Sequence, residues 1–113
     1  KTMKKPITRR MEAAAEQVLR YIPSSKNLRV STRSLCYSTN LSPREMKECI
    51  AILRIDHPIV STLGSGGGYW MAKTAEDMDA YLNMMKSRRD TYAHTIQIME
   101  EHRTNLIDVN QEV

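Results

Sequence analysis

The sequence predicts a mainly α-helical domain with one small β-hairpin, followed by a long C-terminal helix. Apolar residues recur at helical spacing in three stretches before residue 56, a glycine-rich segment at 64–68 separates two short apolar stretches, and no Gly or Pro follows residue 73. These three observations predict the fold class. A chain of 113 residues accommodates one compact domain with an appendage, so we expect a domain at 1–73 and a separate helix within 74–113.

Two helices are expected in the first third of the chain. The first has apolar residues at helical spacing on one face, which are Ile7, Met11, Ala14, Ala15, Val18 and Ile22. Pro23 ends this helix, because proline lacks the amide hydrogen and clashes with the preceding turn. Residues 27–30 are expected to form a short edge strand that leads into Ser31, a favourable N-cap for a second helix over 32–37. Asn40 then tolerates the left-handed conformation of a tight turn between helices.

The third helix has the clearest start signal in the sequence. Ser42 is suited to be the N-cap, Pro43 to occupy the first helical position, and Glu45 to complete a capping box. Helical spacing then gives one apolar face, with Met46, Cys49, Ile50 and Leu53. The opposite face carries Arg44, Lys47, Glu48 and Ala51. The helix is expected to end by Asp56, because His57 precedes a proline and that position disfavours helix.

A β-hairpin is expected after the third helix. Residues 59–63 and 69–72 are short apolar stretches, and the flexible glycine-rich segment 64–68 joins them. Tyr69 and Trp70 alternate across the second strand, so one of the two side chains is expected to pack inward. Packing of this kind is favoured over stacking of an exposed ring on nucleic-acid bases.

The C-terminal helix, which Thr74 is expected to cap, carries an apolar stripe with a seven-residue repeat. Its residues are Met78, Leu82, Met85, Tyr92, Ile96, Met99 and Leu106. A helix over 74–107 is about 51 Å long, more than the domain can cover, so we expect a homodimer held by this stripe. Arg89 and Arg103 interrupt the seam, and their pairing with acidic residues of the opposite chain favours an antiparallel or crossed arrangement. The alternative is a break near Ser87 that folds the helix back onto its own domain.

Composition excludes several classes of protein. The chain is 41% hydrophobic and 27% charged, and no apolar run approaches the roughly 18 residues of a membrane span, so no membrane partner is expected. The basic start is interrupted at Glu12 before any signal-like apolar stretch, and a cytoplasmic, nucleoid-associated location is therefore expected. Cys36 and Cys49 fit neither a disulfide framework nor a zinc spacing, and both are expected to be reduced core residues.

The charge is unevenly distributed along the chain. Residues 1–73 carry 13 Lys and Arg against 5 Asp and Glu, a formal charge of +8, whereas residues 74–113 carry 4 against 8, a formal charge of −4. A basic front and an acidic back are typical of proteins in which one part meets a polyanion. The N-terminal domain is therefore expected to bind nucleic acid.

The stretch VSTRSLCYSTNLSPREM at residues 30–46, within this order of helices and hairpin, closely resembles the core of the winged helix-turn-helix superfamily. The resemblance covers roughly residues 7–73. It implies that Leu35 and Cys36 pack inward, that Leu41 fills the turn, that a recognition helix spans about 42–55, and that a wing spans 59–72. The hairpin, its YWMA end and the long helix also resemble small DNA-binding proteins of bacteriophages and prophages.

The resemblance implies double-stranded DNA binding, sequence-selective or general, by a transcriptional regulator or replication accessory factor. A recognition helix contacts base edges in the major groove with its N-terminal residues, here Ser42, Arg44 and Lys47, with Ala51 small enough to allow close approach. The negative charges of Glu45 and Glu48 nearly cancel the positive charges of Arg44 and Lys47 in the first turns of this helix. Phosphate contacts are therefore expected also from the N-terminal arm, the first helix and the strand that follows it, with Lys1, Lys4, Lys5, Arg9, Arg10, Lys26, Arg29 and Arg33, and Ser65 is a further expected DNA contact. The alternative for the first five residues is a disordered basic tail.

Other functional classes have weaker support in the sequence. The glycine-rich segment lacks the Lys-Ser/Thr ending of a phosphate-binding loop, and His57, His94 and His102 match no metal-ligand spacing. No catalytic motif is recognisable, so we expect no enzyme activity, no catalytic residues, no metal and no cofactor. The main alternative to DNA binding is a protein-interaction adaptor that uses a face of the domain or the methionine-bearing C-terminal helix.

Overall fold

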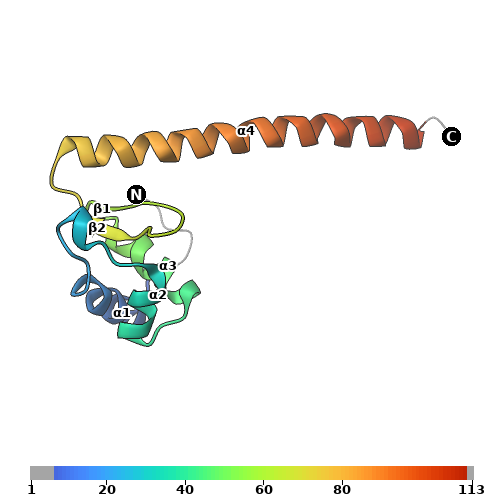
Figure 1. The fold of residues 1–113 in the computed structure, drawn as a ribbon. Helices are drawn as coiled ribbons and strands as arrows, with labels where there is room; N and C mark the ends of the chain where they lie inside the picture. Colours follow the sequence, from blue (N-terminus) through green and yellow to red (C-terminus); the bar gives the residue numbers. More distant parts are fainter. Residues whose placement is uncertain (1–6, 112–113) are drawn as a thin grey trace. The chain divides into compact units, whose positions relative to one another are not determined.

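The computed structural model describes residues 7–111 (Figure 1). In chain order the elements are α1 (Arg9–Leu19), the 3₁₀ helix η1 (Lys26–Leu28), α2 (Thr32–Thr39), α3 (Pro43–Leu53), β1 (Ile59–Ser61), β2 (Tyr69–Met71) and α4 (Ala75–Gln111). The fold class is thus confirmed as mainly helical with a two-stranded antiparallel hairpin and a long C-terminal helix. The basic arm expected at Lys1, Lys4 and Lys5 lies outside the described residues.

Local capping interactions set the helix boundaries. The Ser31 hydroxyl accepts a hydrogen bond from the Ser34 amide at 3.1 Å, and α2 begins at the next residue. The Thr74 hydroxyl accepts one from the Asp77 amide at 3.1 Å, so α4 begins with the cap that was expected. Asn40 ends α2 in the left-handed conformation, with φ of 58°, which confirms the expected tight turn between α2 and α3.

The hydrophobic core lies among α1, α2, α3 and the start of β1. Its buried residues are Ala15, Val18, Ile22, Leu35, Met46, Cys49, Ile50, Leu53 and Ile59. The expected apolar faces of the first and third helices are confirmed by this burial. Cys36 and Leu41 are half-buried at the edge of the core, and neither cysteine forms a disulfide. Full burial of a side chain such as Met46 contributes about 1.5–3 kcal/mol to folding.

The hairpin has its own small apolar cluster. β1 and β2 pair in the register Ile59–Met71, Val60–Trp70 and Ser61–Tyr69. Trp70 is buried with Val60 and Ala72, and Met78 and Tyr81 from the first turns of α4 pack against this cluster. Tyr69 is half-buried against the main core, so both rings pack inward, on opposite faces of the hairpin, where one was expected. The burial of Trp70 excludes its stacking on a base in this conformation.

The strand expected at residues 27–30 is wrong. Lys26–Leu28 forms a 3₁₀ helix, because the Ser25 hydroxyl accepts a hydrogen bond from the Asn27 amide at 3.3 Å and caps a local turn. Only Val30 pairs with the hairpin, through two backbone hydrogen bonds to Tyr69 of 3.1 and 2.8 Å. Gly68 permits this approach, since a Cβ atom there would lie 2.7 Å from the carbonyl oxygen of Val30.

The contacts divide the chain into two units, one ending at Tyr81 and the other beginning at Leu82. We call them the N-terminal unit and the C-terminal segment. The first two turns of α4 belong to the N-terminal unit because Met78 and Tyr81 pack on its hairpin cluster. The division thus falls inside α4, eight residues after the expected domain end at Lys73.

Candidate functional site

The exposed side of α3 carries four of the residues expected to contact DNA. Ser42, Arg44, Lys47 and Ala51 are exposed, and we call them the α3 outer face. The other side of the same helix is fully engaged in the core, where Met46, Cys49, Ile50 and Leu53 are buried. The helix is therefore fixed by one face and presents the other to solvent, as the spacing predicted.

The start of α3 is fixed by a complete capping box. The Ser42 amide donates to Glu45 Oε1 at 3.0 Å, and the Glu45 amide donates to Ser42 Oγ at 3.1 Å. The hydrogen bonds from Ser42, with the nearby charge of Arg10 as a minor contribution, lower the pKa of the Glu45 carboxyl below its usual value. Glu45 is therefore ionised at neutral pH, and its charge is held at the helix N-terminus, beside Ser42.

The two cations of the α3 outer face differ in their partners. Arg44 Nε lies 3.8 Å from Glu48 Oε1, one turn along the helix, with the two side chains 83% and 39% exposed. An exposed pair of this kind contributes only about 0.3–0.5 kcal/mol, so Arg44 can exchange Glu48 for another anion at little cost. Lys47 forms no ion pair with any residue from 7 to 111. The outer face thus offers one cation that is weakly held and one that is unpaired within the described chain.

A groove of about 440 Å³ lies between the starts of α1 and α3. Its lining residues are Thr8, Arg10, Met11, Ala14, Leu41, Glu45, Glu48 and Cys49. The groove brings Arg10, a residue expected to contact phosphate, beside the start of α3. Burial, with added repulsion from Glu45 and Glu48, raises the pKa of the Cys49 thiol, so Cys49 is protonated at neutral pH and is a poor nucleophile.

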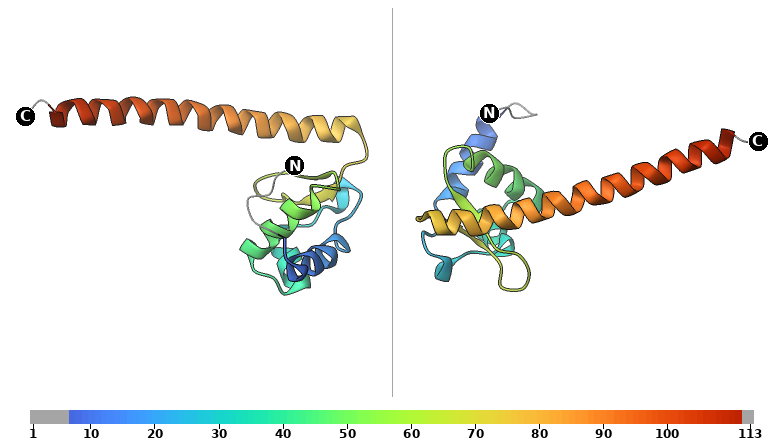
Figure 2. Two further views of the ribbon diagram at one scale, coloured as in Figure 1. Left: turned by 180° about the vertical axis from the view of Figure 1, so that it is seen from behind. Right: turned by 90° about the horizontal axis from the view of Figure 1, so that it is seen from above.

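The remaining expected DNA contacts lie on separate elements. Arg9 is exposed at the first position of α1, and Arg33 is exposed in the first turn of α2. Ser65 is exposed in the loop between β1 and β2, which extends beyond the two strands (Figure 2). The structure therefore brings Arg10 beside Glu45 and Glu48 rather than beside the cations of the α3 outer face. Arg9, Arg33 and Ser65 are presented by other parts of the N-terminal unit.

Arg29 holds the hairpin loop, a role that differs from the phosphate contact expected for it. Its Nε donates to the Gly66 carbonyl at 2.8 Å, and its Nη1 donates to the Lys26 carbonyl at 2.9 Å. Gly66 adopts a φ of 77°, a conformation that favours glycine, and so turns its carbonyl within reach. Arg29 thereby connects η1 to the loop that carries Ser65.

Sequence analysis assigned no role to Arg54, which follows α3 and is half-buried. Its Nε donates to the Ile59 carbonyl at 2.9 Å, and its Nη2 donates to Ser61 Oγ at 3.4 Å. The guanidinium also lies 5.0 Å from the ring centre of Tyr81 and 5.9 Å from that of Tyr69. Arg54 therefore joins the end of α3 to the hairpin and to the first turns of α4.

The expected dimerisation residues separate into two groups. Met78 packs within the N-terminal unit, whereas the other six are 40–67% exposed. We call these six the α4 stripe: Leu82, Met85, Tyr92, Ile96, Met99 and Leu106. Every residue from 85 to 109 is exposed, and the helix continues through Ser87 without the break that a folded-back arrangement requires.

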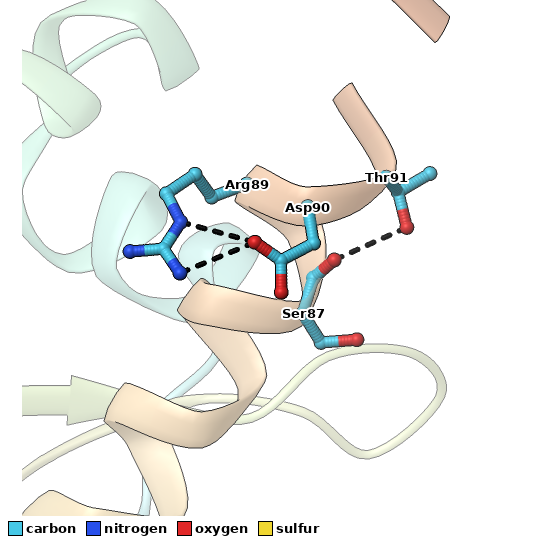
Figure 3. A network of polar contacts seen from close by, with 4 residues as sticks. All are labelled: Ser87, Arg89, Asp90 and Thr91. Atoms are coloured by element: carbon cyan, nitrogen blue, oxygen red, sulfur yellow. Dashed lines mark hydrogen bonds and ion pairs between the residues drawn. The ribbon is translucent and has the colours of Figure 1, made fainter. Parts of the chain in front are cut away.

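The polar contacts in the middle of α4 are local ones (Figure 3). Arg89 donates to Asp90 Oδ1 from Nε at 3.2 Å and from Nη2 at 3.1 Å, and the two side chains are 68% and 70% exposed. Thr91 Oγ1 donates to the Ser87 carbonyl at 3.1 Å. Arg89 is thus paired with its neighbour in the same chain.

Comparison with protein-family models, with curated proteins and with solved structures finds no match for this chain. Within residues 7–111, no three His, Cys, Asp or Glu side chains come together as a metal site. In the same part of the chain, no helix combines the length and the apolar character that crossing a membrane requires. The α3 outer face and the α4 stripe are therefore the two features from which function can be argued.

Proposed function

We propose that the N-terminal unit is a winged helix-turn-helix domain that binds double-stranded DNA, as a transcriptional regulator or replication accessory factor. The observation that carries the proposal is the α3 outer face. It presents Arg44 and Lys47 on a helix whose other side is buried and whose start is fixed by a capping box. In this proposal α3 is the recognition helix, and the loop between β1 and β2 is the tip of the wing.

The dimensions and charges of the α3 outer face suit a major groove. The groove is about 12 Å wide and admits one helix, whose first turns reach the base edges. Arg44 can contact guanine after it leaves Glu48, Lys47 can contact phosphate, and Ala51 has no side chain long enough to keep the helix away from the bases. Arg9, Arg10, Arg33 and Ser65 supply phosphate contacts around the recognition helix.

The proposal is tested by measuring the affinity of the full chain for random-sequence duplexes by fluorescence anisotropy at several salt concentrations. Lys47→Ala is expected to weaken binding to all sequences and to reduce the slope of log affinity against log salt by about 1. Arg44→Ala is expected to relax sequence preference by roughly 1–3 kcal/mol in a selected site. Neither substitution should alter the melting temperature, because both side chains lie outside the core.

Arg20→Ala is the matched control for these two substitutions. Arg20 is exposed at the end of α1, about 15 Å along that helix from Arg10, and its loss should leave binding unchanged. Absence of any salt-dependent binding by the wild-type chain contradicts the proposal. It would favour the second candidate, a protein-interaction adaptor, which the carboxylates of Glu45 and Glu48 beside the α3 outer face support.

A further inference from the structure

The C-terminal segment combines two properties that conflict in an isolated chain. Every side chain from residue 85 to residue 109 is exposed, yet the segment is continuously helical. Helices in proteins are stabilised mainly by the packing of an apolar face, and the α4 stripe is such a face, left exposed by the described residues 7–111. A partner that covers the stripe removes this conflict.

We propose that a second copy of this chain covers the α4 stripe, with the two helices antiparallel and centred on His94. Residues at equal distances from His94 then lie opposite one another, in the pairs Leu82 with Leu106, Met85 with Arg103, Arg89 with Met99, and Tyr92 with Ile96. A two-fold interface requires this kind of self-complementary spacing, in which one surface matches itself after rotation. The proposal does not depend on DNA binding by the N-terminal unit.

Arg89 and Arg103, which interrupt the α4 stripe, favour an antiparallel over a parallel arrangement of the two helices. In a parallel pair in register, Arg89 would face its own copy, and so would Arg103, which places like charges in the seam. In the antiparallel pair each arginine faces a methionine, whose flexible side chain can pack against the aliphatic part of the arginine. The bond between Arg89 and Asp90 can persist in this arrangement, because it lies within one chain.

The charges beside the stripe point to the same orientation. Lys86 directly follows Met85, and Glu100 directly follows Met99, so both flank the stripe on the same side. In an antiparallel pair, residues of the same flank meet, and Lys86 of each copy lies near Glu100 of the other. Within one helix the two residues are about 21 Å apart, so they cannot pair inside a single chain.

The first test is sedimentation equilibrium of the full chain at micromolar concentration, which is expected to show a dimer. Ile96→Asp places a charge in the centre of the seam in both copies and is expected to weaken the dimer about a hundredfold or more. Ile98→Asp is the matched control: it makes the same change at an exposed isoleucine of α4 that lies outside the stripe, and the dimer should persist. A monomeric wild-type chain, a higher oligomer, or equal effects of the two substitutions overturn the proposal.

The second test fixes the orientation by charge exchange. Lys86→Glu alone and Glu100→Lys alone each place like charges together twice per dimer, and each is expected to weaken the dimer about fivefold. The double variant, Lys86→Glu with Glu100→Lys, restores opposite charges and should recover the wild-type dissociation constant. Failure of the double variant to recover it overturns the antiparallel arrangement, because a parallel pair does not bring these two residues together.

Circular dichroism on each variant accompanies both tests and separates the loss of a contact from the loss of the helix. A variant that is monomeric and still folded in its N-terminal unit, as reported by the fluorescence of Trp70, supports the assignment of the seam to α4. A variant in which the N-terminal unit is also unfolded argues against it, because all six stripe residues belong to the C-terminal segment.

Discussion

The N-terminal unit and the C-terminal segment use the same sequence pattern with opposite outcomes. Both carry apolar residues at helical spacing, but Met46 is fully buried in the core whereas Met99 is 60% exposed. The periodicity of a helix therefore identifies which face is apolar and leaves open what covers it. In the N-terminal unit the cover comes from the same chain, whereas in the C-terminal segment the apolar face is exposed among the described residues.

The two regions also differ in how their helices are held. α3 has a capping box, a buried face and, just after its end, the contact of Arg54 with the distant Tyr81 ring. Between Leu82 and Val109, the described polar contacts of α4 are short-range, such as those of Arg89 and Thr91 (Figure 3). Long-range packing makes α3 part of a unit that unfolds cooperatively. A helix held by local contacts alone has a stability that depends strongly on its environment.

The largest expected effect comes from the same substitution, Met to Ala, made once in the N-terminal unit and once in the C-terminal segment. Met46→Ala removes a fully buried side chain and is expected to lower the free energy of unfolding of the N-terminal unit by about 2–5 kcal/mol. Met99→Ala should leave that free energy unchanged, because its side chain contributes nothing to the core. Urea unfolding followed by Trp70, the single tryptophan of the chain, measures the N-terminal unit alone. Similar losses in the two variants would contradict the division of the chain.

A substitution with an intermediate expected effect on stability tests where the boundary between the N-terminal unit and the C-terminal segment lies. Arg54→Met keeps the aliphatic part of the side chain but removes the hydrogen bond to the Ile59 carbonyl and the contact with the Tyr81 ring. We expect a loss of about 1–2 kcal/mol in the same urea experiment. Arg44→Met, on the exposed face of the same region, is the control and should cost less than about 0.5 kcal/mol. Equal losses would mean that Arg54 does not hold the hairpin and α4 together.

The smallest expected effect concerns the capping box and its pH dependence. The pKa of Glu45 is lowered in the folded state, so its carboxylate stabilises folding above the ordinary glutamate pKa of about 4.3. This contribution is lost as the pH falls from there through the lower pKa of the folded chain. Glu45→Gln keeps a neutral hydrogen-bond acceptor. The free energy of unfolding of the wild type should therefore exceed that of the variant at pH 6, and the difference between the two should narrow at pH 3. A gap that is equal at both pH values would show that the charge of Glu45 plays no part.

Features that depend on neighbouring residues were predictable from the sequence. The caps at Ser31, Ser42 and Thr74 and the left-handed Asn40 were all expected, because each depends on side chains within four residues. The order of helices and strands followed from Gly, Pro and the spacing of apolar residues, but several ends did not. α1 ends at Leu19, before Pro23, α2 continues to Thr39 rather than residue 37, and β1 ends at Ser61 rather than residue 63. The exposed side of α3 was also predictable, since burial of Met46 and Ile50 fixes the direction in which Arg44 and Lys47 point.

Features that depend on distant residues were not predictable. Arg29 was expected at phosphate because it is basic, but its partner is the Gly66 carbonyl, 37 residues along the chain. Residues 27–30 were expected as a strand, but of these four only Val30 pairs with the edge of the hairpin, at Tyr69. Tyr81 as a partner of Arg54 has no sequence signal either, because an arginine and a tyrosine 27 residues apart form no recognisable pattern.

The length of α4 has a geometric consequence for the two proposals taken together. Leu82 directly follows the N-terminal unit, and in the proposed antiparallel pair it lies beside Leu106 of the second copy. At about 1.5 Å per residue, 24 residues of helix place the two Leu82 positions about 36 Å apart. Successive major grooves on one side of a DNA duplex are separated by about 34–36 Å. If both proposals hold, backbone geometry alone would place the two copies one duplex turn apart, which is the spacing that adjacent half-sites require.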